Sequence, residues 1–257
     1  MTKRYWVFPL LIMAVACGNN TPDESQQAVT QKDYSVVKIY PHNSATFTEG
    51  LYLKGQTMYE SAGNKGKSKL LVYDLASGKV SQSLDLDKSL FGEGISEVDG
   101  KIYQLTWQDH KVFVYDGKTL ALIKQMTWPY EGWGMTTDGK NLIISVGSSN
   151  IYYVNPADFS IIRTVGVTNN YGPLSMINEL EYVDGFIYAN VWQTDNIVKI
   201  DPASGAVVKT LDLAGIREDN GISPTGDWLN GIAYNPTNKT LLITGKHWSN
   251  IFEIKLK

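Results

Sequence analysis

Short apolar segments of about six residues recur along the chain, and turns rich in Gly, Asp and Asn separate them. Five segments share one pattern, in which such a turn precedes a short apolar strand. They are MYESAG (58–63), IYQLTW (102–107), LIISVG (142–147), IYANVW (187–192) and LLITGK (241–246). Alternation of apolar and polar positions is typical of β-strands, and no run of 12 or more residues keeps a helical period. The chain is therefore predicted to be all-β.

Each of these segments begins a series of further strand patterns. In the first series LLVYD (70–74) runs into a turn with Asp and Gly (74–78), and another strand pattern follows. Units of about four strands and roughly 40–50 residues are typical of propeller blades. Five such units fit between Tyr34 and Lys257. We therefore predict a five-bladed β-propeller, and the alternatives are a β-sandwich or a different number of blades.

The two ends of this repeat are complementary. The fifth unit stops at IFEIKLK (251–257), one strand short, whereas SVVKIY (35–40) precedes the first unit without a partner. Pairing these segments would remove an open sheet edge, which is a site for unwanted association. The N-terminal strand is therefore predicted to complete the last blade and close the ring.

The N-terminal segment has the features of an export signal. Two basic residues at positions 3 and 4 precede an apolar run over 5–16, which is too short to cross a bilayer as a helix. The sequence AVAC (14–17) resembles a bacterial lipoprotein box with Cys17 as the lipidated residue, although Ala14 stands where Leu is usual. The alternative is an ordinary signal peptide.

Three segments follow from these patterns. Residues 1–16 are predicted to be a lipoprotein signal peptide, residues 17–33 a polar flexible tether, and residues 34–257 the propeller domain. We expect an exported protein that a lipid on Cys17 anchors to a membrane, on the periplasmic or cell-surface side.

Composition excludes several classes of function. The 23 Lys and Arg against 26 Asp and Glu give a net charge of −3, so no basic surface for nucleic acid is expected. A single Cys excludes an intrachain disulfide and a Cys-based metal site. The 3 His are far apart, so a His-rich zinc centre is not expected. We therefore expect an enzyme or binding protein without a cofactor, and we expect a monomer.

Alignment of the five units places two sets of residues at equivalent positions near the propeller axis. The first set is Glu49, Glu93, Trp133, Asn178 and Asn230, and the second is Gly63, Trp107, Gly147, Trp192 and Lys246. A purely structural propeller would carry similar residues at equivalent positions. Here the residues at equivalent positions differ in type, which favours a functional site built on the scaffold. The alternative is that the Trp residues are core and the Glu-Gly pairs are turns.

The types of residue in these sets suggest acid/base chemistry. Glu93 would point into a mouth walled by Trp107, Trp133 and Trp192, where burial raises a carboxyl pKa towards the range of a general acid/base. Such aromatic walls also enclose a small side chain and exclude water.

The remaining polar members have complementary roles. Asn178 can donate to a carbonyl and accept from an amine. Lys246 supplies a positive charge for an oxygen that becomes negative. Glu49 would add an acceptor for a substrate ammonium group.

Seven blocks of sequence, in order, resemble one family. They are YPHNSATFTEGL, LFGEGI, YQLTW, EGWGMTTDG, NELEYVDGFIYANVWQTDNIVKIDP, LNGIAYNP and LLITGKHW, spread over residues 34–257. This pattern is similar to the plant-type and bacterial glutaminyl cyclases, also called glutamine cyclotransferases. The resemblance implies a five-bladed propeller that converts the N-terminal Gln of a peptide to pyroglutamate and releases ammonia, without a catalytic metal or cofactor.

The resemblance also implies residue roles. The general acid/base of the family falls on Glu93, and its amide and lysine fall on Asn178 and Lys246. Its aromatic walls fall on Trp107, Trp133 and Trp192, with Phe47 and Phe91 lining the same mouth. At Glu49 the chain departs from the family, which commonly carries Gln there.

Two other functions remain open from the sequence. One is a non-catalytic surface propeller that binds a peptide end or a sugar. The other is a lactonase-like hydrolase with an axial calcium, for which Glu49, Glu93, Asn178 and Asn230 are the candidate ligands. Activity on a Gln-initiated peptide in excess EDTA distinguishes the three.

Overall fold

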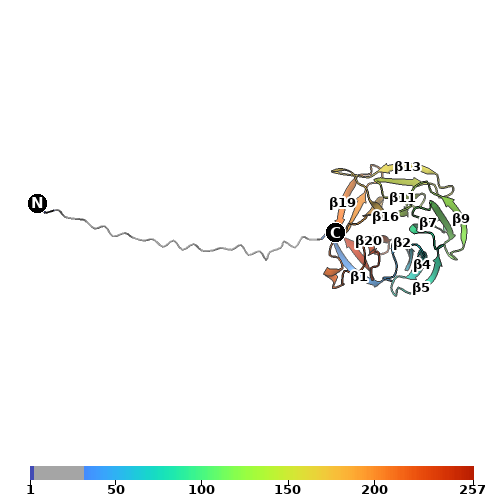
Figure 1. Ribbon diagram of the computed structural model, residues 1–257, viewed down its shortest axis with the longest axis horizontal. Helices are drawn as coiled ribbons and strands as arrows, with labels where there is room; N and C mark the ends of the chain where they lie inside the picture. Colours follow the sequence, from blue (N-terminus) through green and yellow to red (C-terminus); the bar gives the residue numbers. More distant parts are fainter. Residues whose placement is uncertain (3–31) are drawn as a thin grey trace. The chain divides into compact units, whose positions relative to one another are not determined.

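The computed structural model describes residues 1–2 and 32–257. Cys17 and nearly all of the predicted signal peptide and tether lie outside these residues. Residues 32–257 form one unit, in which five four-stranded antiparallel sheets surround an axis (Figure 1). The predicted five-bladed propeller is therefore confirmed. No helix within the described residues is long and apolar enough to cross a membrane.

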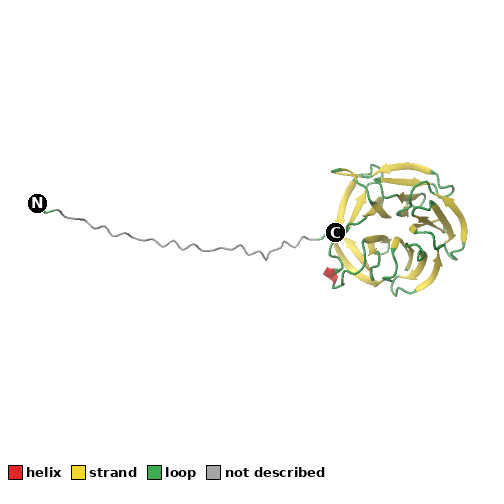
Figure 2. Cartoon of the chain, in the orientation of Figure 1, coloured by secondary structure: helices red, strands yellow, loops and turns green. Residues whose placement is uncertain are grey.

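Each blade runs from an inner strand at the axis to an outer strand at the rim (Figure 2). Blade 1 contains β2 (Thr48–Lys54), β3 (Thr57–Ala62), β4 (Lys69–Asp74) and β5 (Val80–Asp85). Blade 2 contains β6 (Gly92–Val98), β7 (Lys101–Thr106), β8 (Lys111–Asp116) and β9 (Leu122–Thr127). Blade 3 contains β10 (Met135–Thr137), β11 (Leu142–Ser145), β12 (Asn150–Val154) and β13 (Ile161–Gly166).

The last two blades complete the ring. Blade 4 contains β16 (Ile177–Val183), β17 (Phe186–Val191), β18 (Asn196–Ile200) and β19 (Val207–Asp212). Blade 5 contains β20 (Leu229–Asn235), β21 (Thr240–Gly245), β22 (Asn250–Leu256) and β1 (Tyr34–Pro41). Two small elements were not predicted, the hairpin β14 (Thr168–Asn169) and β15 (Gly172–Pro173) and the 3₁₀ helix η1 (Glu218–Asn220).

The ring closes as the sequence predicts. Strand β1 pairs antiparallel with β22, from Tyr34 opposite Leu256 to Pro41 opposite Asn250. The N-terminal strand thus forms the outer edge of a blade whose other three strands come from the C-terminus.

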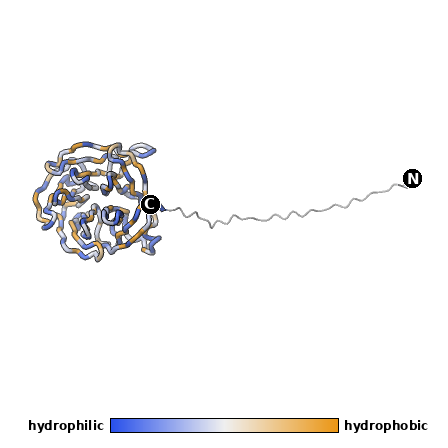
Figure 3. The backbone as a smooth tube through the Cα atoms, turned by 180° about the vertical axis from the view of Figure 1, so that it is seen from behind, coloured by the Kyte–Doolittle hydropathy of each residue, from blue (hydrophilic) through white to orange (hydrophobic). Residues whose placement is uncertain are grey.

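Within the blades, strands near the axis are more buried than strands at the rim. Hydrophobic and hydrophilic residues alternate along the blades (Figure 3). All six residues of β21 are buried, whereas the outer strand β5 has no buried residue. Buried side chains of neighbouring blades pack on one another, as where Trp128 meets Tyr152 and Phe159 edge-to-face. The core therefore lies between the blades and holds the inner strands in place.

Topology places one set of loops at one end of the ring. In an antiparallel blade the turn from first to second strand lies at one end, and the turn from second to third strand lies at the other. The segments that lead from one blade to the next share the second end, which we term the mouth face. It includes 42–47, 63–68, 86–91 and 246–249. Residues far apart in the chain are thereby brought together around the axis.

Candidate active site

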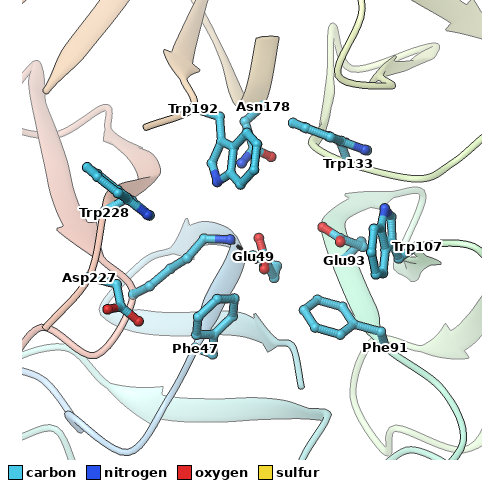
Figure 4. Close-up of a pocket in the computed structure, with 11 residues that line it drawn as sticks. Phe47, Glu49, Phe91, Glu93, Trp107, Trp133, Asn178, Trp192, Asp227 and Trp228 are labelled. Atoms are coloured by element: carbon cyan, nitrogen blue, oxygen red, sulfur yellow. Dashed lines mark hydrogen bonds and ion pairs between the residues drawn. The ribbon is translucent and has the colours of Figure 1, made fainter. Parts of the chain in front are cut away.

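A cavity of about 390 Å³ opens on the mouth face (Figure 4). Its lining contains all nine residues predicted to be catalytic or substrate-binding, together with two that were not predicted. They are Phe47, Glu49, Phe91, Glu93, Trp107, Trp133, Asn178, Trp192 and Lys246, and then Asp227 and Trp228. Asn230, aligned with them in the sequence, does not line this cavity.

Irregular pairing of the inner strands presents the polar residues. In four blades the first strand has a β-bulge or register shift at its mouth end. The shifts lie between Thr48 and Gly50, Gly92 and Ile95, Ile177 and Leu180, and Leu229 and Ile232. Each shift includes one residue of the first aligned set, namely Glu49, Glu93, Asn178 or Asn230. A bulge removes a residue from the regular ladder and redirects its side chain.

Glu49 forms a buried ion pair with Lys246. Lys246 Nζ lies 2.5 Å from Glu49 Oε1, and the two side chains are 5% and 3% exposed. Asn230 Nδ2 donates to Glu49 Oε2 at 3.2 Å. Burial raises the pKa of Glu49 to about 7, although the charge of Lys246 opposes this shift. Glu49 is therefore committed to partners within the protein.

Glu93 has different surroundings. It is 6% exposed and faces the cavity. Among the residues that the structure describes, no side chain or main-chain group hydrogen-bonds to its carboxyl group. Burial and the charge of Glu49 raise the pKa of Glu93 well above its ordinary value, while Lys246 opposes this shift. Of the two buried carboxyl groups in the cavity lining, Glu93 is therefore the one whose oxygen atoms are available to a ligand.

Aromatic rings form the walls of the cavity. Phe47 and Phe91 meet edge-to-face with centroids 6.1 Å apart, and Phe91 meets Trp107 in the same way at 5.7 Å. On the opposite side Trp133 and Trp192 are 5.5 Å apart and nearly perpendicular. Edge-to-face pairs support one another in fixed orientations. The cavity therefore has two rigid apolar walls on either side of the carboxyl groups.

Two glycines at the second aligned level make room for these rings. A Cβ atom on Gly63 would lie 2.4 Å from Phe91 Cε1, and one on Gly147 would lie 2.5 Å from Trp133 Cζ2. Any larger residue would displace the ring. The glycines at these positions are thus required by the aromatic walls, which explains why the second aligned set alternates large and small residues.

Glu131 supports two of the walls, and its role was not predicted. Its Oε2 accepts hydrogen bonds from Trp107 Nε1 at 2.9 Å and from Trp133 Nε1 at 3.2 Å. Its Oε1 accepts from Gln108 Nε2 at 2.9 Å. One carboxylate thus joins indoles from two neighbouring blades. A sequence signal existed, because Glu131 stands two residues before Trp133 in EGWG.

The main chain of Asn178 is fixed by a hydrogen bond, while its side-chain oxygen is available to a ligand. Ser145 Oγ donates to Asn178 O at 2.7 Å, which fixes the strand position. Asn178 Oδ1 is buried and has no hydrogen-bond partner within residues 32–257. A buried acceptor without a partner is costly unless a ligand or water supplies one.

The two cavity residues that were not predicted are tied to Lys246. Asp227 N donates to Lys246 O at 2.8 Å, and Lys246 N donates to Trp228 O at 2.9 Å. Both residues belong to the long segment between β19 and β20, where the blade repeat gives no alignment. They therefore form a rim beside Lys246. This rim could not be predicted by aligning the repeated units.

The arrangement does not fit an axial calcium site. Of the four candidate ligands, Glu49 is bound by Lys246 and Asn230, so an ammonium group already balances its charge. Within the described part of the chain, no group of three or more His, Cys, Asp or Glu side chains is placed to hold a metal ion.

Known proteins resemble this chain over most of its length. Residues 9–256 match the family described as Glutamine cyclotransferase. A protein of Arabidopsis thaliana named glutaminyl-peptide cyclotransferase is 35% identical over 231 residues, which are 88% of this chain and 72% of that protein.

Two solved structures are also similar to this chain. The crystal structure of Myxococcus xanthus glutaminyl cyclase matches with a TM-score of 0.79 and 31% identity over 87% of this chain and 96% of that one. The WD40 β-propeller domain of Doa1 matches with a TM-score of 0.50 and 11% identity, over 80% of this chain and 63% of that one. The second likeness supports the propeller fold alone.

Proposed function

Because this chain belongs to the glutamine cyclotransferase family, we propose that it converts the N-terminal glutamine of peptides and proteins to pyroglutamate and releases ammonia. One observation carries the proposal beyond the family relationship. Glu93 is buried, without a hydrogen-bond partner among the described residues, and lies between two aromatic walls of a cavity about 390 Å³ in volume. Such a site can enclose one side chain and move a proton.

Binding brings the reacting atoms of the substrate together. The α-amine of the N-terminal Gln must attack the Cδ atom of its own side chain, which requires a folded rotamer. The aromatic walls exclude water and restrict the side chain, with Trp107 on one side and Trp133 and Trp192 on the other. Holding two groups in reacting geometry supplies a large part of the rate in intramolecular reactions.

Glu93 then serves as general base and general acid. The carboxylate accepts a proton from the attacking nitrogen as the N–Cδ bond forms. It returns that proton to the side-chain amide nitrogen as the Cδ–Nε2 bond breaks, so that ammonia leaves and the five-membered lactam remains. The raised pKa of Glu93 suits this role, because a group that accepts and returns a proton works best near the operating pH.

Lys246 and Asn178 stabilise the polar parts of the reaction. The amide oxygen of the substrate becomes negative in the tetrahedral intermediate, and the Lys246 ammonium group has hydrogen atoms beyond the one directed to Glu49. Asn178 Oδ1 accepts a hydrogen bond from the substrate nitrogen. Glu49 therefore acts by orienting Lys246, rather than by binding the substrate ammonium itself.

The direct test is turnover of a short Gln-initiated peptide in excess EDTA. We expect ammonia release and loss of the mass of one ammonia from the peptide. The control is the same peptide acetylated at its N-terminus, which lacks the nucleophile. Absence of turnover would support a binding propeller, and activity that EDTA abolishes would support a metal-dependent hydrolase.

We also propose that the protein is exported and that a lipid on Cys17 anchors it to a membrane, on the periplasmic or cell-surface side. The support is the sequence alone, with an apolar run over 5–16 followed by AVAC. Substitution Cys17→Ser is expected to move the cyclase activity from the membrane fraction to the soluble fraction. A variant that stays in the membrane fraction after signal removal would contradict the lipid anchor.

A further inference from the structure

A second cavity opens on the mouth face beside the active-site cavity. Its volume is about 370 Å³, and Phe47 lines both cavities. The rest of its lining comes mainly from two loops of blade 1, over 62–69 and 85–88. We term it the lysine groove, after its lining residues Lys67, Lys69 and Lys88.

The lysine groove has positive charge that the protein does not neutralise. Lys69 Nζ lies 3.4 Å from Asp85 Oδ1, the acidic residue of the lining. Within residues 32–257, no carboxylate lies within ion-pairing distance of Lys67 or Lys88, and both residues are exposed. Asp87, next to Lys88, does not line the groove. Two ammonium groups are thus available to a ligand.

Other parts of the mouth face have the opposite charge. The segment 213–228 carries Arg217 with three acidic residues, and one of them, Asp227, lines the active-site cavity. Glu131 stands behind the walls of Trp107 and Trp133. Lys32 pairs with Asp219, one of these three acidic residues, so the free negative charge near the cavity comes mainly from Asp227 and Glu131. The lysines of the lysine groove that have no partner within residues 32–257 thus lie on a different side of the mouth from these two carboxylates.

The rest of a bound peptide substrate must extend from the active site to the solvent through this mouth. Its first residue lies at Glu93, which is buried, so the following residues extend towards the surface. An extended chain advances about 3.4 Å per residue. The second and third residues of a chain directed over Phe47 therefore lie at the lysine groove.

We propose that the lysine groove binds an acidic side chain at the second or third position of the substrate, so that the enzyme prefers peptides that begin with Gln followed closely by Glu or Asp. This proposal rests on the proposed function and adds a substrate class to it. Lysine ammonium groups form charge-assisted hydrogen bonds with carboxylates, and exposed pairs of this kind weaken as salt is added.

The test compares tetrapeptides that differ only at the second and third positions, such as Gln-Glu-Ala-Phe, Gln-Ala-Glu-Phe, Gln-Ala-Ala-Phe and Gln-Lys-Ala-Phe. We expect kcat/KM to be highest for the two acidic peptides, and the preference to shrink at high salt. The double substitution Lys67→Gln/Lys88→Gln should lower kcat/KM for acidic peptides by about two- to fivefold per lysine. The change should lie in KM, because the contact is remote from the reacting atoms.

A matched control removes the same charge elsewhere. Lys101 and Lys140 are exposed and lie at turns between first and second strands, on the face opposite the mouth. Lys101→Gln/Lys140→Gln should leave the preference unchanged.

The outcomes separate the two proposals. No turnover of Gln-Ala-Ala-Phe would overturn the proposed function. Turnover of that peptide without a preference for acidic peptides would overturn the lysine groove and leave the cyclase activity intact. A preference that survives in Lys67→Gln/Lys88→Gln would also overturn the groove.

Discussion

Two buried glutamates, Glu60 on β3 and Glu93 on β6, have opposite electrostatic surroundings. Glu60 lies at the seam between blades 5 and 1, where the ring closes. Its Oε2 is 3.0 Å from His42 Nε2, and its Oε1 accepts a hydrogen bond from Thr48 Oγ1 at 2.7 Å. Glu93 has no such partner in the described part of the chain and faces the active-site cavity.

The pKa values of the two groups diverge accordingly. Burial alone would raise the pKa of both. At Glu60 the charge and hydrogen bonds of His42 outweigh burial and lower the pKa, whereas at Glu93 the neighbouring charge of Glu49 raises it further. Partners rather than burial therefore distinguish a structural carboxylate from one that can transfer a proton.

The strongest test of this comparison is Glu93→Gln. The amide keeps the shape of the side chain but cannot accept and return a proton, so we expect kcat to fall by about 10²–10⁴-fold. The melting temperature should stay the same or rise, because Glu93 has no internal hydrogen bond to lose. Ammonia release and circular dichroism melting measure the two quantities. A variant with more than a tenth of the wild-type rate would remove Glu93 as the acid/base.

The converse substitution, Glu60→Gln, should affect stability rather than chemistry. Breaking a buried ion pair leaves its partner uncompensated, and we expect unfolding free energy to fall by about 3 kcal/mol. Urea unfolding measures this loss, while kcat of the folded protein should stay near the wild-type value. The control is Glu97→Gln, which removes a partly exposed pair with Lys54 and should cost less than about 1 kcal/mol.

The loss of stability in Glu60→Gln should depend on pH, because the pKa values of His42 and Glu60 are both shifted. Interaction with Glu60 outweighs burial and raises the pKa of His42, so the contribution of His42 is full below about pH 6.5 and is lost as the pH rises through the raised value. The pKa of Glu60 is lowered, so its contribution is full above about pH 4.3 and is lost as the pH falls through the lowered value. The difference between wild type and Glu60→Gln should therefore be largest at roughly pH 5–6. An equal difference at alkaline pH would show that the pair is not ionic.

A smaller effect is expected from Glu131→Gln, which changes the support of the cavity. Glu131 does not line the cavity, but it holds the indoles of Trp107 and Trp133 through one oxygen atom. Loss of these charge-assisted bonds should loosen both walls and raise KM about three- to tenfold. The negative charge of Glu131 also contributes to the raised pKa of Glu93, so the acidic limb of the pH profile should move slightly to lower pH.

The control for this positioning role is Gln108→Ala. It removes the other partner of Glu131 without touching either indole. Unchanged KM and pH profile in Glu131→Gln would mean that packing alone orients the two Trp residues.

Local pattern and repetition made most of this architecture predictable. Strand alternation and turns recur in every blade, so equivalent positions such as Glu49, Glu93 and Asn178 could be aligned before their geometry was known. The N-terminal strand could be placed because the last unit lacked one strand. The structure adds the β-bulges that present these side chains. Such bulges leave no signal in the pattern of apolar residues.

Specific pairings between residues of different blades, and residues outside the repeat, were not predictable. Lys246 and Glu49 are 197 residues apart, and nothing in either local sequence specifies their pairing. Asp227 and Trp228 belong to a long connection that no other blade repeats. A side chain becomes predictable from a repeat only where its own segment takes part in that repeat.

The finest test concerns Glu49, which is paired with Lys246 beside Glu93. Glu49 raises the pKa of Glu93 by charge repulsion, and it also offsets the charge of Lys246. Substitution Glu49→Gln removes both influences, so Glu93 should ionise more readily and its pKa should fall. The acidic limb of kcat/KM, which reports groups of the free enzyme, is therefore expected to move to lower pH by roughly one unit.

The matched control for Glu49→Gln is Glu181→Gln. Burial raises the pKa of Glu181 to about 7, as it does for Glu49, but Glu181 lines a cavity formed by turns at the face opposite the mouth. Its removal should leave the profile unchanged, although loss of a bond to Tyr234 N lowers stability. A shift in Glu49→Gln but not in Glu181→Gln would establish that the effect depends on the mouth rather than on net charge. Superimposable profiles for Glu49→Gln and wild type would mean that the Lys246 ion pair already screens Glu93 from Glu49.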